Sequence, residues 1–126
     1  MKVKIDTRER FHVITIDEAS ISANMTEKMD KVLLPLLENN VKNIVLNIKD
    51  IQKLDYAAAV QLIALQQRFY AEGASFVVCG LQSGVKQFLD GHDLLDQLNY
   101  TPTESEAMDI VQMEEIERDM DDTDDI

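Results

Sequence analysis

The chain has 126 residues, of which 45% are hydrophobic, and its formal net charge is −12. This length is sufficient for one domain with a single hydrophobic core. The acidic balance opposes non-specific binding to nucleic acid or to an anionic membrane surface. No apolar run approaches the roughly 20 residues of a membrane span, and residues 1–6 lack the apolar stretch of a signal peptide. We therefore expect a cytoplasmic protein.

The first part of the chain predicts a β-hairpin. Val3 and Ile5 alternate with lysines, residues 7–10 are polar, and residues 11–16 are β-branched and strand-like. Two short strands joined by a polar turn are expected to pair with each other.

A helix is predicted next. Asn24 and Glu27 have the spacing of a capping box, and the apolar residues that follow recur at helical spacing. Pro35 lies inside this pattern, where it removes one backbone hydrogen bond, so we expect a kink or an early end.

The middle of the chain predicts two buried strands that flank a long helix. Residues 44–48 and 76–79 are almost continuously apolar, as expected for strands covered on both faces. The stretch between them predicts a helix over residues 57–72, which Gly73 ends.

The last elements are shorter. Ser83 is expected to cap a helix that ends at Gly91, and residues 97–100 are expected to form a short strand. Pro102 and the capping-box pair Thr103 and Glu106 then predict the start of a final helix. Strands separated by helices indicate parallel βαβ crossovers, here preceded by an antiparallel hairpin. The fold class is therefore α/β, with a mixed sheet and about four helices.

The C-terminal segment is strongly acidic. Residues 114–126 contain eight acidic side chains and one basic side chain, Arg118, for a net charge of −7. We expect a domain over residues 1–113 and a solvated, disordered tail over residues 114–126. The tail either confers solubility or docks on a basic surface of a partner.

A spaced pattern in the middle of the chain resembles the STAS domain, and more narrowly the bacterial anti-sigma factor antagonists. The pattern consists of Asp50-Ile51, Leu54-Asp55, a helix, Gly73, Ser75 to Gly80, and the segment Val85 to Leu89. This resemblance implies that Asp55 should be followed by two hydroxyl residues and a glycine, the second hydroxyl being phosphorylated by a kinase that is also the anti-sigma factor. Those three positions are Tyr56, Ala57 and Ala58 here, so Ala57 is a degenerate phosphosite.

The resemblance directs attention to the edge of the helix that begins near residue 57. The predicted partner-binding residues are Asp55, Tyr56, Ala57 and Ala58, together with Ser22 and Asn24 from the loop that enters the first helix. Asp55 has a second interpretation as a helix N-cap. Tyr56 is either an aromatic anchor for a partner or a residue packed on its own loop.

Catalytic and metal-binding patterns are lacking in the sequence. His12 and His92 have no Cys or second His at metal-ligand spacing, and Cys79 is expected to be a small core residue. Residues 80–84 lack the Gly-Lys-Ser/Thr ending of a phosphate-binding loop. We therefore expect no enzyme activity, no cofactor and no metal.

The sequence thus predicts a non-enzymatic interaction module that binds a kinase-like anti-sigma factor and has no phosphorylation switch. The alternative is an accessory or structural STAS subunit of a larger assembly, such as a lipid-transport ATPase. A small ligand would require a concave apolar pocket.

Overall fold

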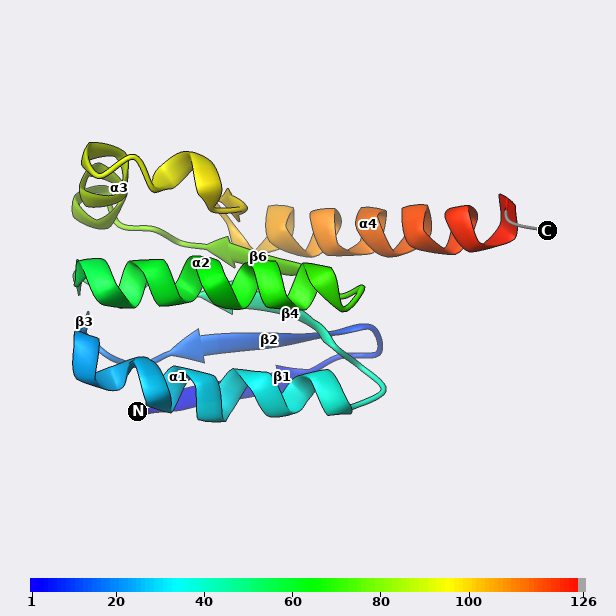
Figure 1. Ribbon diagram of the computed structural model, residues 1–126, viewed down its shortest axis with the longest axis horizontal. Coiled ribbons are helices and arrows are strands. Elements are labelled where there is room, and N and C mark those ends of the chain that lie inside the picture. The colour runs from blue at the N-terminus through cyan, green and yellow to red at the C-terminus, as the bar shows by residue number, and fades with distance from the viewer. Residues whose placement is uncertain (125–126) are drawn as a thin grey trace.

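The computed structural model describes residues 1–124, with side chains to residue 120, and its centre is a five-stranded sheet (Figure 1). The spatial order is β1 (Val3–Thr7), β2 (Phe11–Ile16), β4 (Asn43–Asn47), β6 (Phe76–Cys79) and β7 (Tyr100–Thr101). β1 pairs with β2 in antiparallel fashion, and the other neighbours are parallel. The predicted α/β fold with a mixed sheet and an N-terminal hairpin is confirmed.

Four α-helices are present in the described residues: α1 (Thr26–Leu33), α2 (Tyr56–Ala71), α3 (Ser83–Gly91) and α4 (Glu104–Asp124). Short 3₁₀-helices, η1 (Ala23–Met25), η2 (Leu34–Glu38) and η3 (Leu95–Gln97), accompany them. The first three helices pack on one face of the sheet, and α4 packs on the other face. Each face therefore has its own apolar layer.

The central strand β4 shows why the sheet is covered on both sides. Ile44 and Leu46 belong to the core shared with α1 and α2, whereas Val45 belongs to the smaller core shared with Ala107 and Val111 of α4. Successive side chains of a strand point to opposite faces. An uninterrupted apolar run is therefore the correct pattern for this position.

Several predicted helix boundaries need correction. The Asn24 capping box does not form: η1 begins at Ala23, and α1 has Met25 at its N-cap position with no side-chain cap. Ser83 is the first residue of α3, and Gln82 holds the N-cap position. The last strand lies at Tyr100–Thr101, because residues 95–97 form η3.

Other predicted boundaries are confirmed. α1 ends at Leu33 and the chain continues as a 3₁₀-helix that contains Pro35, which is the early end expected. Gly73 follows α2 with a φ of 78°, a backbone conformation that favours glycine. The Oγ1 atom of Thr103 accepts a hydrogen bond from the Glu106 N–H at 3.2 Å and caps α4.

The acidic C-terminal segment differs from its prediction. α4 continues as a helix from Glu104 to Asp124, so no break occurs at residue 113 where a disordered tail was expected. Polar contacts with the body explain part of this order, because Glu114, Glu115 and Arg118 all bond to residues outside the helix. Residues 125 and 126 lie outside the described part.

Candidate functional site

A small second sheet brings the predicted site together. β3 (Ser20–Ile21) pairs in parallel with β5 (Lys53–Leu54), with Ser20 opposite Lys53 and Ile21 opposite Leu54. The Asp55 N–H donates to the Ile21 carbonyl at 3.0 Å. The hydrogen bonding between the two segments therefore continues as far as Asp55, the residue directly before α2. The loop that enters α1 and the start of α2 are therefore neighbours.

Asp55 occupies the N-cap position of α2 but does not cap that helix with its side chain. Its backbone is extended, with φ −71° and ψ 155°, and its carboxylate makes no hydrogen bond to α2. The Oδ2 atom instead accepts from the Ala23 N–H at 3.2 Å. Asp55 thus connects the start of α2 to η1, and the N-cap prediction is right for the position but wrong for the bond.

Most of the predicted binding residues lie on the surface beside one another. Asp55, Tyr56, Ala57 and Asn24 are exposed and Ser22 is half-buried. The Ser22 Oγ atom donates to the Asn24 side-chain oxygen. Ala58 is the exception, since it is 0% exposed and belongs to the core under α2. Ala58 therefore presents no exposed side-chain surface at this edge.

A small aromatic cluster lies next to this edge. The rings of Tyr56 and His92 meet edge-on with centroids 5.5 Å apart, and His92 also contacts Phe88 at 4.5 Å. Tyr56 comes from α2, whereas Phe88 and His92 come from α3 and the residue after it. The cluster therefore joins the two helices at the surface.

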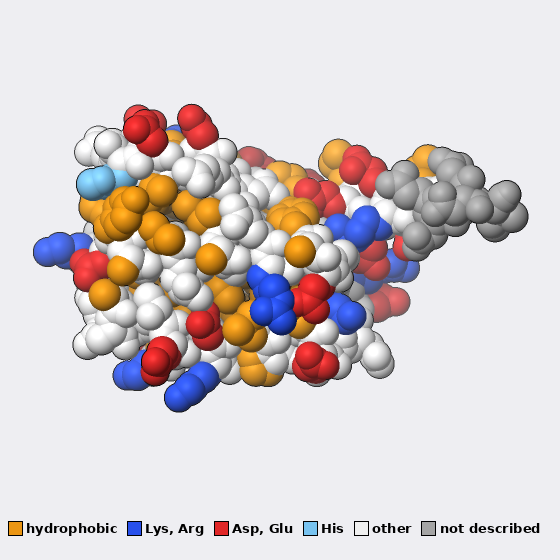
Figure 2. Space-filling model, viewed as in Figure 1, with side chains coloured by type: hydrophobic (Ala, Val, Ile, Leu, Met, Phe, Trp, Pro, Cys, Tyr) orange, Lys and Arg blue, Asp and Glu red, His pale blue; other side chains and the backbone are white. Residues whose placement is uncertain are grey.

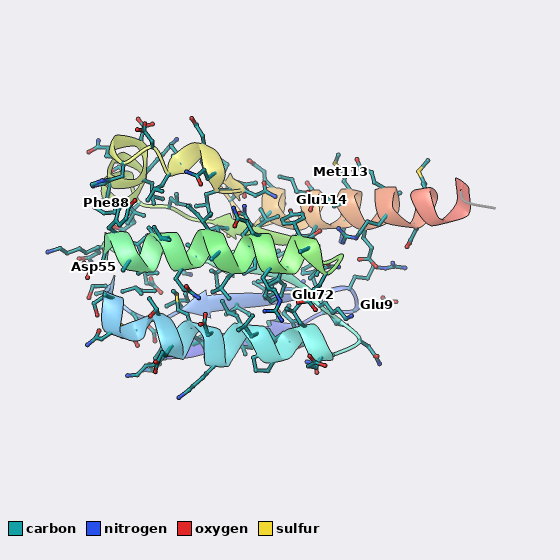
Figure 3. The ribbon with its side chains drawn as sticks, in the orientation of Figure 1. Glu9, Asp55, Glu72, Phe88, Met113 and Glu114 are labelled. Carbon is teal, nitrogen blue, oxygen red and sulfur yellow. The ribbon has the colours of Figure 1, made fainter. Side chains whose placement is uncertain are left out.

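A groove of about 340 Å³ separates the β5–α2 junction from α3. Figure 2 shows hydrophobic side chains gathered at this end of the molecule, and Figure 3 places Asp55 and Phe88 at the same end. The groove is lined by Gln52, Lys53, Leu54, Asp55, Tyr56, Gly84, Val85, Phe88 and His92. The lining therefore combines apolar and aromatic side chains with polar and charged ones.

Sequence reasoning missed the α3 side of this groove. Phe88 fits the apolar stripe of a short helix, and His92 follows a helix-ending glycine, so neither residue suggests a site by itself. Their relevance comes from the packing of α3 beside β5. The sequence pattern alone does not predict that α3 packs beside β5.

A larger polar hollow of about 760 Å³ lies where α4 passes the amino ends of β2 and β4. Its two arginine side chains are engaged, since Arg10 bonds to Glu115 at 3.0 Å and Arg118 donates to the Asn43 side-chain oxygen. Glu9 borders this hollow, and Figure 3 places it at the end away from Asp55. The hollow is therefore separate from the groove.

His12 and Cys79, the other residues considered as possible ligands or reactive groups, are both buried. His12 is buried, with Nδ1 2.9 Å from the Thr7 hydroxyl and Nε2 2.8 Å from the Val41 carbonyl oxygen. Burial, with a smaller contribution from Glu104, raises the pKa of Cys79 to about 11, so this thiol stays protonated near neutral pH. Within residues 1–120, no group of three His, Cys, Asp or Glu side chains could hold a metal ion.

None of the helices described is both long enough and apolar enough to span a membrane.

Comparison with known proteins places the chain in a family. The model of the STAS domain matches residues 2–107, which is most of the sequence. The chain therefore belongs to the STAS domain family. A search of curated proteins gave no match.

Solved structures share this fold at low sequence identity. An anti-sigma factor antagonist from Mycobacterium paratuberculosis has a TM-score of 0.75 and 13% identity, covering 88% of this chain and 93% of that chain. The anti-sigma factor antagonist SpoIIAA, solved in its unphosphorylated form, has a TM-score of 0.68 and 15% identity, covering 88% and 96%. A sulfate transporter family protein from Wolinella succinogenes has a TM-score of 0.64 and 13% identity, covering 82% and 86%.

Proposed function

We propose that this chain is a non-enzymatic interaction module that binds a protein partner through the exposed start of α2 and the groove beside it. The observation that carries the proposal is a pair of exposed apolar side chains, Tyr56 at 53% and Val60 at 43%. They are four residues apart and share one face of α2. Exposed aromatic residues beside an apolar groove are typical anchors of protein interfaces.

The partner proposed is a kinase-like anti-sigma factor. The family resemblance and the fold shared with SpoIIAA support this choice. In such a complex the chain competes with a sigma factor for the anti-sigma factor and so affects transcription. The partner supplies any nucleotide, and no cofactor of the chain itself is required.

The second part of the proposal is that the complex has no phosphorylation switch. The position that corresponds to the phosphorylated hydroxyl is Ala57, which is exposed in the first turn of α2 and has no side-chain hydroxyl to accept a phosphoryl group. The chain is therefore permanently similar to an unphosphorylated antagonist. Incubation with the partner and ATP should add no phosphate to residues 56–58.

The test is a negative charge at the proposed interface. The partner is captured from native lysate, identified by mass spectrometry and purified, and its affinity is measured by calorimetry. Ala57→Asp should weaken binding at least about tenfold, or roughly 1.4 kcal/mol, because the new carboxylate loses hydration on binding. The fold should persist, since an acidic residue is tolerated in a first helical turn.

Ser105→Asp is the matched control. Ser105 is also exposed in the first turn of a helix, α4, and does not line the groove. This variant adds the same charge at an equivalent helical position, so its affinity should equal that of the wild type. If Ala57→Asp binds as tightly as Ser105→Asp, the start of α2 is not the interface.

The second candidate is an accessory STAS subunit of a transport assembly. The fold shared with the sulfate transporter family protein from Wolinella succinogenes favours it. Capture of transport subunits, with affinity unaffected by Ala57→Asp, would support this candidate over the first.

A further inference from the structure

Exposed apolar side chains gather on α4 as well as on α2. Among the described residues, six large hydrophobic side chains are exposed, and three of them are Met113 at 58%, Ile116 at 59% and Met120 at 61%. Met113 lies near the middle of α4, and Ile116 and Met120 lie in its C-terminal half, which extends past the sheet (Figure 1). This is a second apolar surface, at the end of the molecule away from the groove.

The three side chains form one stripe. At 3.6 residues per turn, positions 113, 116 and 120 fall within about 60° of one another around the helix axis. Ala107 and Val111, which pack on the sheet, fall on the opposite side of α4. Figure 3 shows Met113 pointing away from the body, whereas Glu114 bonds to Tyr70 of α2. The stripe, defined as Met113, Ile116 and Met120, therefore faces outward.

Carboxylates surround the stripe. Glu106, Asp109, Glu117 and Asp119 are exposed; the helical spacing places Glu117 and Asp119 on the two sides of the stripe, and Asp109 and Glu106 on the same face about one and two turns before Met113. Residues 104–124 contain ten acidic side chains and one basic side chain, Arg118, a net charge of −9. Arg118 turns inward and donates to Asn43 and Ser75. The outward face of α4 therefore combines apolar side chains with an acidic rim.

We propose that the outward face of α4 binds an amphipathic helix of a partner protein that has an apolar stripe flanked by Lys and Arg. Methionine side chains adapt their shape to an apolar partner, and the stripe spans two helical turns, the spacing at which helices present anchor residues. The acidic rim selects a basic partner by charge. A second copy of this chain is disfavoured, because two acidic rims would face each other.

The probe for this proposal is a fluorescent 18-residue peptide with leucines along one helical face and lysines elsewhere. One comparison peptide has glutamate in place of lysine, and another has the leucines scrambled. Binding is measured by fluorescence anisotropy with the full-length chain. The Leu/Lys peptide should bind, the scrambled peptide should bind at least about tenfold more weakly, and the Leu/Glu peptide should not bind.

The variant that tests the apolar contribution is Met113→Ser with Ile116→Ser, which leaves the charge of α4 unchanged. It should weaken binding of the Leu/Lys peptide at least about tenfold. Ile5→Ser is the matched control, since Ile5 is exposed on β1 and lies outside the stripe. Circular dichroism checks that α4 remains helical. Ala57→Asp should leave the peptide affinity unchanged, which separates this surface from the start of α2.

Two outcomes would overturn the proposal. Equal peptide affinity for the double serine variant and the wild type would show that binding depends on charge alone. A dimer of the wild type in sedimentation velocity that the double serine variant does not form would show that a second copy covers the stripe.

Discussion

At the scale of single residues, Asp55 shows how a predictable position acquires an unpredictable role. An aspartate directly before an alanine-rich run indicates a helix start, and α2 does begin at the next residue. Its carboxylate nevertheless bonds to the Ala23 N–H, 32 residues earlier in the chain. That contact depends on the pairing of β3 with β5, which are only two residues long each. Strands this short have no periodicity to detect in a sequence.

Cys79 shows the opposite case, in which the residue type and its apolar neighbours were enough to predict its burial. A lone cysteine inside an apolar run was expected in the core, and its side chain is 0% exposed. Burial stabilises the neutral thiol and raises its pKa to about 11. The unfolded chain has no such effect, and its thiol ionises near pH 8.5, roughly the ordinary pKa of cysteine.

This difference predicts a loss of stability in alkaline solution. Above about pH 8.5 the unfolded state releases the thiol proton while the native state keeps it, so the free energy of unfolding falls as pH rises. The expected loss between about pH 8.5 and 10 is roughly 1–2 kcal/mol, measured by urea unfolding. Cys79→Ala should lack this part of the pH dependence. If both proteins lose stability equally over this range, the thiol is not responsible.

At the scale of elements, α4 is the part of the fold that the sequence describes least well. Its charge pattern is typical of a disordered tail. The contacts that hold it, however, join Arg118 to the side chains of Asn43 and Ser75, both at 3.1 Å, and Glu115 to Arg10. These partners are 43 to 105 residues away in the chain. Local composition cannot report interactions between groups so distant in sequence.

Removal of the Arg118 side chain should therefore weaken the attachment of α4. Its guanidinium donates to acceptors of residues that are buried, Asn43 at 8% and Ser75 at 0% exposure. Hydrogen bonds from a charged donor contribute about 1.5–3 kcal/mol each at most, so Arg118→Ala should lower the free energy of unfolding by roughly 1–3 kcal/mol. Glu117→Gln, which changes an exposed neighbour, is the control. Equal melting temperatures for Arg118→Ala and wild type would mean that the hydrogen bonds of Arg118 to Asn43 and Ser75 add nothing to the stability of the fold.

Elements with a strong repeating pattern were predicted more reliably. The buried runs of β4 and β6 and the long helix between them follow from hydrophobic spacing. The groove did not follow, because Phe88 and His92 reach Tyr56 only through the packing of α3 beside β5. Periodicity predicts what an element is, whereas a site depends on which elements become neighbours.

At the scale of the whole molecule, charge and exposed apolar surface are both uneven. The start of α2 and the distal half of α4 lie at opposite ends (Figure 1), and each presents exposed hydrophobic side chains. Only the α4 end combines them with a dense acidic rim. The two proposed partners would therefore differ in charge, and the separation of the two surfaces would allow both to bind at once.

The concentration of acids in the C-terminal segment also makes a prediction about stability. A net charge of −12 destabilises a compact state through self-repulsion. Salt reduces this effect, because the Debye length falls from about 30 Å at 0.01 M to about 3 Å at 1 M ionic strength. We expect the melting temperature to rise by roughly 4 °C between low salt and 0.5 M NaCl, equivalent to about 1 kcal/mol for a chain of this size.

The source of the repulsion can be located by removing charges without shortening the chain. A variant with Asn at positions 121, 122, 124 and 125 loses four of the acidic side chains and has a net charge of −8 in place of −12. Its melting temperature should rise less with salt than that of the wild type, because less repulsion remains to be screened. Deletion of residues 121–126 removes the same four charges and should give the same reduced salt dependence. Differential scanning calorimetry at several NaCl concentrations measures all three proteins. If the three salt dependences coincide, the four acids at positions 121–125 do not contribute to the repulsion.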